Sequence, residues 1–175
     1  MSFTNDYELL KDHFHVFRSV SYDKMMNLIY KFKTGILYIG GTWCKNCQAI
    51  ISILNKTAKK CKIRTIYHYD PHFINIFKEE TDLRDCKDLE TKLNYYYLIE
   101  KIGYQSEELV QDTLIPRLPV PAIIGIKNGI CVGIITDEYE MKNECLVKDN
   151  DSKDYTEEYT NKLEELFLKV KAKSK

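Results

Sequence analysis

Two cysteines, Cys44 and Cys47, are the residues of this sequence best suited to chemistry, and only two residues separate them in the stretch WCKNC. An apolar run, ILYI, precedes the pair, and an apolar run with helical spacing follows it. Two thiols at this spacing form a redox dithiol, half of a zinc site, or a pair of small core side chains. The neighbouring residues indicate which of these three kinds of site is present.

The pattern after the cysteines predicts a helix over residues 44–60, which places Cys44 at its N-terminus. Unpaired backbone N–H groups and the helix macrodipole favour an anion at that position, and Lys45 adds a positive charge. Because the thiolate is the nucleophilic form of cysteine, we expect Cys44 to be the attacking thiol. Cys47 lies one turn later and faces the core, where it is placed to resolve a mixed disulfide.

WCKNC, between a buried strand and a helix, resembles the active site of the thioredoxin family. Farther downstream, VPAIIGIKNG resembles the family's segment of an apolar residue, a cis-proline, a strand and a Lys-Asn-Gly hairpin. The match covers roughly residues 20–136 and the last helix. The resemblance implies that Trp43 packs beside the exposed sulfur and that a cis peptide bond links Val120 to Pro121. It also implies that the Val120 backbone pairs with an extended substrate.

The resemblance implies a thiol–disulfide oxidoreductase that reduces protein disulfides through a dithiol–disulfide cycle of Cys44 and Cys47. It needs no cofactor, and a thioredoxin-reductase-type protein is a candidate electron donor. An alternative is a protein-binding module with the same fold and a slow or idle dithiol. A peroxidase is a weaker third hypothesis, since that chemistry usually requires an arginine near a single activated cysteine, and the sequence shows no such arrangement.

Two positions depart from the family pattern. Lys45 and Asn46 stand between the cysteines, where the family often has Gly-Pro, and these residues help to tune the thiolate. Tyr38 stands in the preceding strand, where the reductants of the family keep a buried acid. A tyrosine is a poor base near neutral pH, so we expect deprotonation of Cys47 to be slow or assisted by water.

A zinc site is disfavoured because structural zinc takes four ligands, and the sequence has neither a second CxxC pair nor a His-x-x-x-His motif. His68, Asp70 and His72 in HYDPH have the spacing of metal ligands, but Pro71 breaks the regularity of a strand. We expect a polar loop there and no metal ion.

The other four cysteines have no partner motif. Cys61 continues the inward face of the helix and Cys131 lies in an apolar strand, so both should be buried and inert. Cys86 and Cys145 lie in polar segments and should be ordinary surface thiols.

The elements that must position the dithiol alternate between strand and helix, which predicts parallel pairing with helices on both faces of a sheet. A closing hairpin at Asn128-Gly129 adds an antiparallel pair. The expected fold is α/β and thioredoxin-like, a three-layer arrangement of a mixed central sheet flanked by helices, within a single domain spanning residues 1–175. Strands are expected at residues 15–20, 36–39, 63–69 and on both sides of the Asn128-Gly129 turn.

Four helical segments complete the pattern. Residues 21–35 should form a helix that buries Met25, Ile29 and Phe32 and ends at Gly35. A helical insertion over residues 71–115, before the proline strand, should contain a helix at residues 87–102 and a short one at 106–111. The expected inner face of the longer helix is Leu89, Leu93, Tyr96 and Ile99, with the row Tyr95 to Tyr97 anchoring it. A polar, turn-rich segment at residues 141–154 precedes a last helix at 155–170.

Composition limits the partners. Lys and Arg together number 26, as do Asp and Glu, so a near-zero net charge suggests neither nucleic acid nor an anionic membrane. The first residues do not resemble a secretory signal, and no apolar stretch is long enough to span a bilayer. We therefore expect a cytosolic monomer whose cysteines are mostly reduced.

Overall fold

The structure is a computed structural model that describes residues 7–74, 80–85, 88–149 and 151–172. A five-stranded mixed sheet forms its centre, in the order β1-β3-β2-β6-β7. The first three of these strands run parallel, whereas β6 and β7 run antiparallel to their neighbours. The strands are β1 (Phe17–Ser19), β2 (Gly35–Ile39), β3 (Ile66–Tyr69), β6 (Ala122–Lys127) and β7 (Ile130–Ile135).

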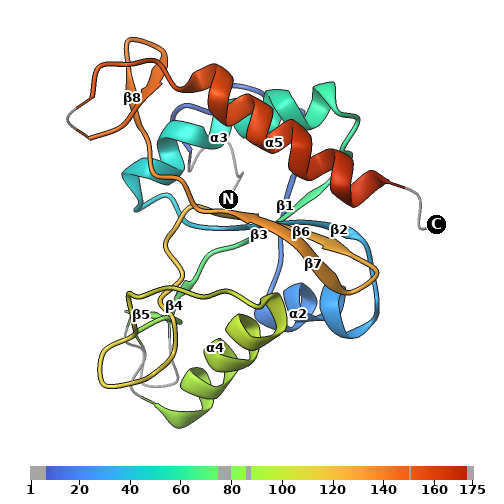
Figure 1. The fold of residues 1–175 in the computed structure, drawn as a ribbon, viewed down its shortest axis with the longest axis vertical. Coiled ribbons are helices and arrows are strands. Elements are labelled where there is room, and N and C mark those ends of the chain that lie inside the picture. Colours follow the sequence, from blue (N-terminus) through green and yellow to red (C-terminus); the bar gives the residue numbers. More distant parts are fainter. Residues whose placement is uncertain (1–6, 75–79, 86–87, 150, 173–175) are drawn as a thin grey trace.

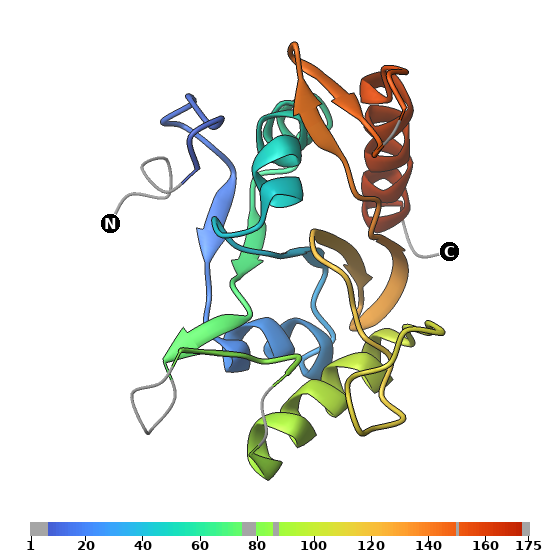
Figure 2. The same cartoon turned by 90° about the vertical axis from the view of Figure 1, so that its left-hand side faces the viewer.

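Helices cover both faces of this sheet (Figures 1 and 2). α3 (Lys45–Lys60) and α5 (Thr156–Lys171) pack against each other on one face. α2 (Tyr22–Tyr30) and α4 (Leu89–Ile102) lie on the other. The three layers, the mixed sheet and the helix before the proline strand agree with the expected arrangement. The fold is thioredoxin-like.

α5 packs closely on the sheet because two glycines make room for it. A Cβ atom on Gly125 of β6 would lie 2.8 Å from side-chain atoms of Leu166 and Val170, and one on Gly133 of β7 would lie 2.9 Å from Leu166. The inner face of α5, which includes Leu166 and Val170, is buried. The interface between α5 and the sheet therefore depends on the absence of side chains at these two positions.

The insertion contains a small hairpin, β4 (His72–Ile74) with β5 (Glu80–Asp82), followed by α4. Asp88 caps the start of α4 by accepting a hydrogen bond from the N–H of Thr91, and Gly103 ends the helix with a φ of 65°. The short helix expected at residues 106–111 is absent. Instead, the Ser106 hydroxyl accepts a hydrogen bond from the N–H of Glu108, which closes a turn.

The expected inner face of α4 is wrong in three of its four positions. Leu89 is 73% exposed, and Leu93 and Tyr96 are exposed as well. The physical reason is Tyr95, whose hydroxyl donates to the Pro116 carbonyl at 2.9 Å and accepts from the Leu118 N–H at 2.7 Å. These bonds turn α4 so that a different row is buried: Tyr95, Leu98, Ile99 and Ile102. The prediction that the tyrosine row anchors this helix holds for Tyr95 alone.

Two further expectations need correction. α2 ends at Tyr30 rather than near Gly35, and Phe32 is 78% exposed because its backbone, with a φ of 50°, has already left the helix. The segment expected to consist of turns contains a hairpin, β8 (Glu140–Lys142) with β9 (Cys145–Val147). The hairpin predicted at Asn128-Gly129 is confirmed, with both residues at positive φ. No described helix has the length and apolar character needed to cross a membrane.

Candidate active site

Cys44 lies at the N-cap of α3, which follows β2 after the short connection at residues 40–43. Its Sγ accepts a hydrogen bond from the backbone N–H of Cys47 at 3.2 Å. The same sulfur lies 3.6 Å from the Val120 carbonyl oxygen, to which the thiol donates. Cys44 is partly exposed.

The surroundings of Cys44 lower its pKa to about 7. The main cause is a hydrogen bond between the two cysteine side chains, and the backbone N–H groups of Cys47 and Asn46 also contribute. These are the unpaired donors of a helix start, which favour an anion. A pKa near 7 places much of this thiol in its nucleophilic form at neutral pH.

Cys47 is the opposite kind of thiol. It is fully buried, at 0% exposure, and burial raises its pKa well above the usual range. The negative charge of a Cys44 thiolate raises that pKa further. Both cysteines are free thiols in the structure. The pair therefore consists of a partly exposed thiol with a lowered pKa and a buried thiol with a raised one.

Pro121 directly precedes β6, and the Val120–Pro121 peptide bond is cis, as expected. Both residues are buried, and the contact between Cys44 Sγ and the Val120 carbonyl joins this segment to the dithiol. The structure thus brings Cys44 to the Val120–Pro121 segment, which lies far from it in the sequence.

Trp43 is 41% exposed and lies between the dithiol and the insertion. Its Nε1–H donates to the Asp70 carboxylate at 3.0 Å, and its ring stacks on His72 with a centroid separation of 3.9 Å and an interplanar angle of 6°. His72 in turn places its Nε2 3.0 Å from the Asp82 carboxylate. Contacts with the insertion therefore orient the indole.

Arg84 lies beside the site, although nothing in the sequence predicted it there. It is buried in the insertion, where its guanidinium pairs with the Asp82 carboxylate at 2.6 Å and donates to the Leu118 carbonyl at 3.3 Å. Its Cζ lies 5.6 Å from the centre of the Trp43 ring. The positive charge of Arg84 contributes to the lowered pKa of Cys44. An arginine therefore lies close enough to the dithiol to affect its charge, although no motif in the sequence marks this residue.

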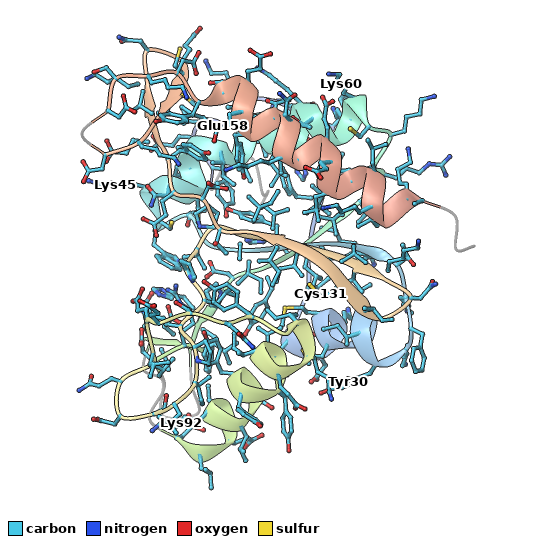
Figure 3. All side chains as sticks on the ribbon, in the orientation of Figure 1. Tyr30, Lys45, Lys60, Lys92, Cys131 and Glu158 are labelled. Atoms are coloured by element: carbon cyan, nitrogen blue, oxygen red, sulfur yellow. The ribbon has the colours of Figure 1, made fainter. Side chains whose placement is uncertain are left out.

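The two residues between the cysteines take different places. Lys45 opens α3 and is exposed (Figure 3). Asn46 contributes its backbone N–H to the Cys44 sulfur, and its side-chain amide donates to Glu138 at 3.3 Å. Of the two, Asn46 has the more direct contact with the reactive sulfur.

A buried polar group of three side chains, Tyr7, Tyr38 and His68, lies behind Cys47. The hydroxyls of Tyr7 and Tyr38 are 3.1 Å apart, and the Nε2 of His68 lies 2.8 Å from the Gly40 carbonyl oxygen. His68 belongs to β3, within the strand expected at residues 63–69, and is buried. His72, expected in a polar loop, instead begins β4 and contacts Trp43. Among the described residues, no three His, Cys, Asp or Glu side chains gather as metal ligands would.

The remaining described cysteines are partly buried rather than fully buried or exposed. Burial raises the pKa of Cys61 and of Cys131, which keeps both thiols protonated near neutral pH. Cys131 lies on the α4 side of β7 (Figure 3). Cys145 is hydrogen-bonded to Asp154, which raises its pKa. Cys86 lies outside the described residues.

Comparison with known proteins gives little beyond this geometry. No protein-family model matches the sequence, and no curated protein matches it. Among solved structures, the chain is similar to thioredoxin O2 from Arabidopsis thaliana in its oxidized state, with 13% sequence identity and a TM-score of 0.43. The alignment covers 87% of this chain and 96% of that one. At these values the likeness supports no argument about function, so the chemistry must come from the site.

Proposed function

We propose that this protein is a thiol–disulfide oxidoreductase that reduces protein disulfides through Cys44 and Cys47. The observation that carries the proposal is the contrast between the two thiols. Cys44 is accessible at a helix start with a pKa of about 7, whereas Cys47 is buried beside it with a raised pKa. One thiol is suited to attack a substrate and the other to act afterwards.

In the first step, the Cys44 thiolate attacks one sulfur of a substrate disulfide. A bond forms between Cys44 and that sulfur, and the other substrate sulfur leaves as a thiolate that takes a proton from water. The Cys44 sulfur lies beside the Val120 carbonyl, and we assign the backbone of Val120 and Pro121 to hold an extended substrate there. Trp43, exposed on the neighbouring side, supplies an apolar contact surface.

In the second step, Cys47 loses its proton to solvent and attacks Cys44. A disulfide forms between the two cysteines, and the substrate sulfur leaves as the second thiol. The dithiol has then given two electrons to the substrate, and it needs a reductant to begin again. We assign that role to an electron donor of the thioredoxin-reductase type, and we place the protein in the cytosol as a single-domain monomer with no cofactor, nucleic acid or membrane partner.

A second candidate function is a protein-binding module with an idle dithiol. The exposed apolar side chains of α4, Leu89, Leu93, Tyr96 and Tyr97, favour it because they face away from the core. An insulin reduction assay separates the two candidates. Catalysis that disappears in the Cys44→Ser variant supports the oxidoreductase, whereas turnover no faster than that of this variant supports the binding module.

Trapping of covalent intermediates tests the assignment of the two cysteines. The Cys47→Ser variant should accumulate mixed disulfides with proteins of a cell extract, because Cys44 can still attack but nothing resolves the product. The Cys44→Ser variant should trap almost none. Both variants are compared on non-reducing gels, where the adducts must disappear on addition of a reductant. Equal trapping by the two variants, or none by Cys47→Ser, contradicts the proposed function.

A further inference from the structure

The buried polar group behind Cys47 has no part in the steps described so far. Its members align across the sheet, since His68 of β3 is the register partner of both Ser19 on β1 and Tyr38 on β2. The rings of Tyr38 and His68 are 5.1 Å apart. Tyr7, from the N-terminal segment, contacts both: its hydroxyl lies 3.1 Å from that of Tyr38 and 3.4 Å from His68 Nε2.

The Gly40 carbonyl oxygen determines which nitrogen of His68 carries the hydrogen. A carbonyl oxygen only accepts, so the Nε2 of His68, at 2.8 Å from the Gly40 oxygen, must carry a hydrogen. Burial lowers the pKa of His68, which keeps the ring neutral and leaves its Nδ1 to accept from the Ser19 hydroxyl at 3.4 Å. The Tyr7 oxygen faces the same Nε2–H and accepts from it. The hydroxyls of Tyr7 and Tyr38 share a hydrogen bond in which either can donate, and when Tyr7 donates the hydrogen of Tyr38 is available to Cys47.

Tyr38 reaches the Cys47 sulfur at Gly40. A Cβ atom on Gly40 would lie 2.6 Å from Cys47 Sγ and 3.1 Å from the Tyr38 hydroxyl oxygen, so both groups pack over the same backbone position. At this position, hydrogen bonding with the Tyr38 hydroxyl lowers the pKa of Cys47 against the effect of burial. Burial raises the pKa of Tyr38 itself well above its usual range, so this phenol keeps its proton.

We propose that Tyr38 acts as a hydrogen-bond donor to the resolving thiolate of Cys47, with Tyr7 and His68 aligned behind it to orient its hydroxyl. This inference rests on the proposed function and specifies how its second step is assisted. Tyr38 does not act as a base. It stabilises the negative charge that develops on Cys47 Sγ. The proton of Cys47 passes to solvent, and Tyr38 ends the step with its own proton in place.

Reaction with a symmetric aromatic disulfide, dithiobis(nitrobenzoate), separates the two steps of the dithiol. Attack by Cys44 releases the first coloured thiolate, and attack by Cys47 on the resulting mixed disulfide releases the second. Cys61, Cys86, Cys131 and Cys145 are replaced by serine so that the colour comes from the dithiol alone. Stopped-flow absorbance across a range of pH values gives a rate and an apparent pKa for each phase.

Tyr38→Phe should leave the first phase within about twofold of the parent and slow the second about tenfold below its apparent pKa, the usual scale of a hydrogen bond to a charged group. The apparent pKa of the second phase should rise by about one unit, with the rate recovering at higher pH. Tyr7→Phe, which keeps the Tyr38 hydroxyl, should shift the same profile less. A defect of packing would instead change the first phase as well, or lower the second phase equally at every pH.

An unchanged second phase in Tyr38→Phe overturns the proposal, and an unchanged profile in Tyr7→Phe overturns the aligned chain behind it. A parent protein without a rapid first phase contradicts the proposed function instead. The donor role is then measured without turnover, in the Cys44→Ser background, by the pH dependence of Cys47 alkylation. There Tyr38→Phe should raise the pH at which alkylation becomes rapid, and no shift would contradict the donor role.

Discussion

Arg84 supplies a positive charge that lowers the pKa of Cys44, although Lys45 is the direct neighbour of Cys44 in the chain. The two cations differ in their effect on this pKa because they differ in burial. Arg84 is held in a buried ion pair with Asp82, where water screens its charge weakly, whereas Lys45 is exposed. A residue of the insertion therefore tunes the reactive thiol.

Replacing Arg84 by glutamine should raise the pKa of Cys44 from about 7 towards that of a free thiol. Because less thiolate is then present near neutral pH, alkylation of Cys44 should slow by about two- to threefold there, and the difference should vanish at alkaline pH. The measurement is the pH profile of alkylation, followed by peptide mapping. Arg84→Lys keeps the charge and should retain most of the effect. A larger shift from Lys45→Gln than from Arg84→Gln would contradict this assignment.

At the scale of single residues, the sequence predicts the position of those that belong to a local motif. Cys44 and Cys47 follow from their spacing at a helix start, and Val120 and Pro121 follow from the resemblance of their segment. Arg84, Tyr7 and His68 reach the site through tertiary contacts between distant segments, and nothing in the residues beside them indicates that contact. The charge and the hydrogen bonds around a thiol are therefore the part of this site that required a structure.

The elements predicted correctly are those with strong local signals. α3 has a single apolar stripe that starts at the cysteines, and the turn at Asn128-Gly129 has the two residues that tolerate positive φ. α4 is different because apolar residues occur on all its sides, so periodicity could not select the buried face. The hydrogen bonds of Tyr95 to the segment at Pro116 and Leu118 select it instead.

Two leucines of α4 make this orientation testable. Leu98→Ala should lower the free energy of unfolding by about 2–5 kcal/mol, because it opens a cavity under a buried side chain. Leu93→Ala removes the same atoms from the exposed face and should change the free energy of unfolding by less than about 1 kcal/mol. Urea unfolding of both variants gives the comparison. Equal losses, or a larger loss for Leu93→Ala, would show that α4 is rotated from the orientation described.

At the scale of the whole molecule, the N-terminal segment, the sheet and the helix after β2 meet at one buried polar group. His68 lies at its centre and is neutral in the folded chain because burial lowers its pKa. An unfolded chain exposes the same imidazole to water, where its pKa is about 6.5. Acid therefore favours the unfolded chain at this residue.

The protonation of His68 makes the stability of the fold depend on pH. Below about pH 6.5 the unfolded chain binds a proton that the folded chain does not, so stability rises with pH up to that value and is lost as the pH falls below it, by at most about 1.4 kcal/mol per pH unit. Urea unfolding between about pH 5 and 7.5 measures this slope. His68→Gln, whose amide can still donate to Gly40, should flatten it. His15, whose pKa burial also lowers, contributes with the same sign, so His15→Gln is the matched comparison. A slope that His68→Gln leaves unchanged would contradict a neutral, buried His68.

The stacked pair of Trp43 and His72 has an optical consequence. The sequence contains one tryptophan, so all indole fluorescence of this protein comes from a ring beside the dithiol. A neighbouring disulfide quenches an excited indole. We therefore expect the emission of Trp43 to report the oxidation state of the two cysteines. The molecule therefore carries its own fluorophore, through which oxidation of the two cysteines can be followed without a label.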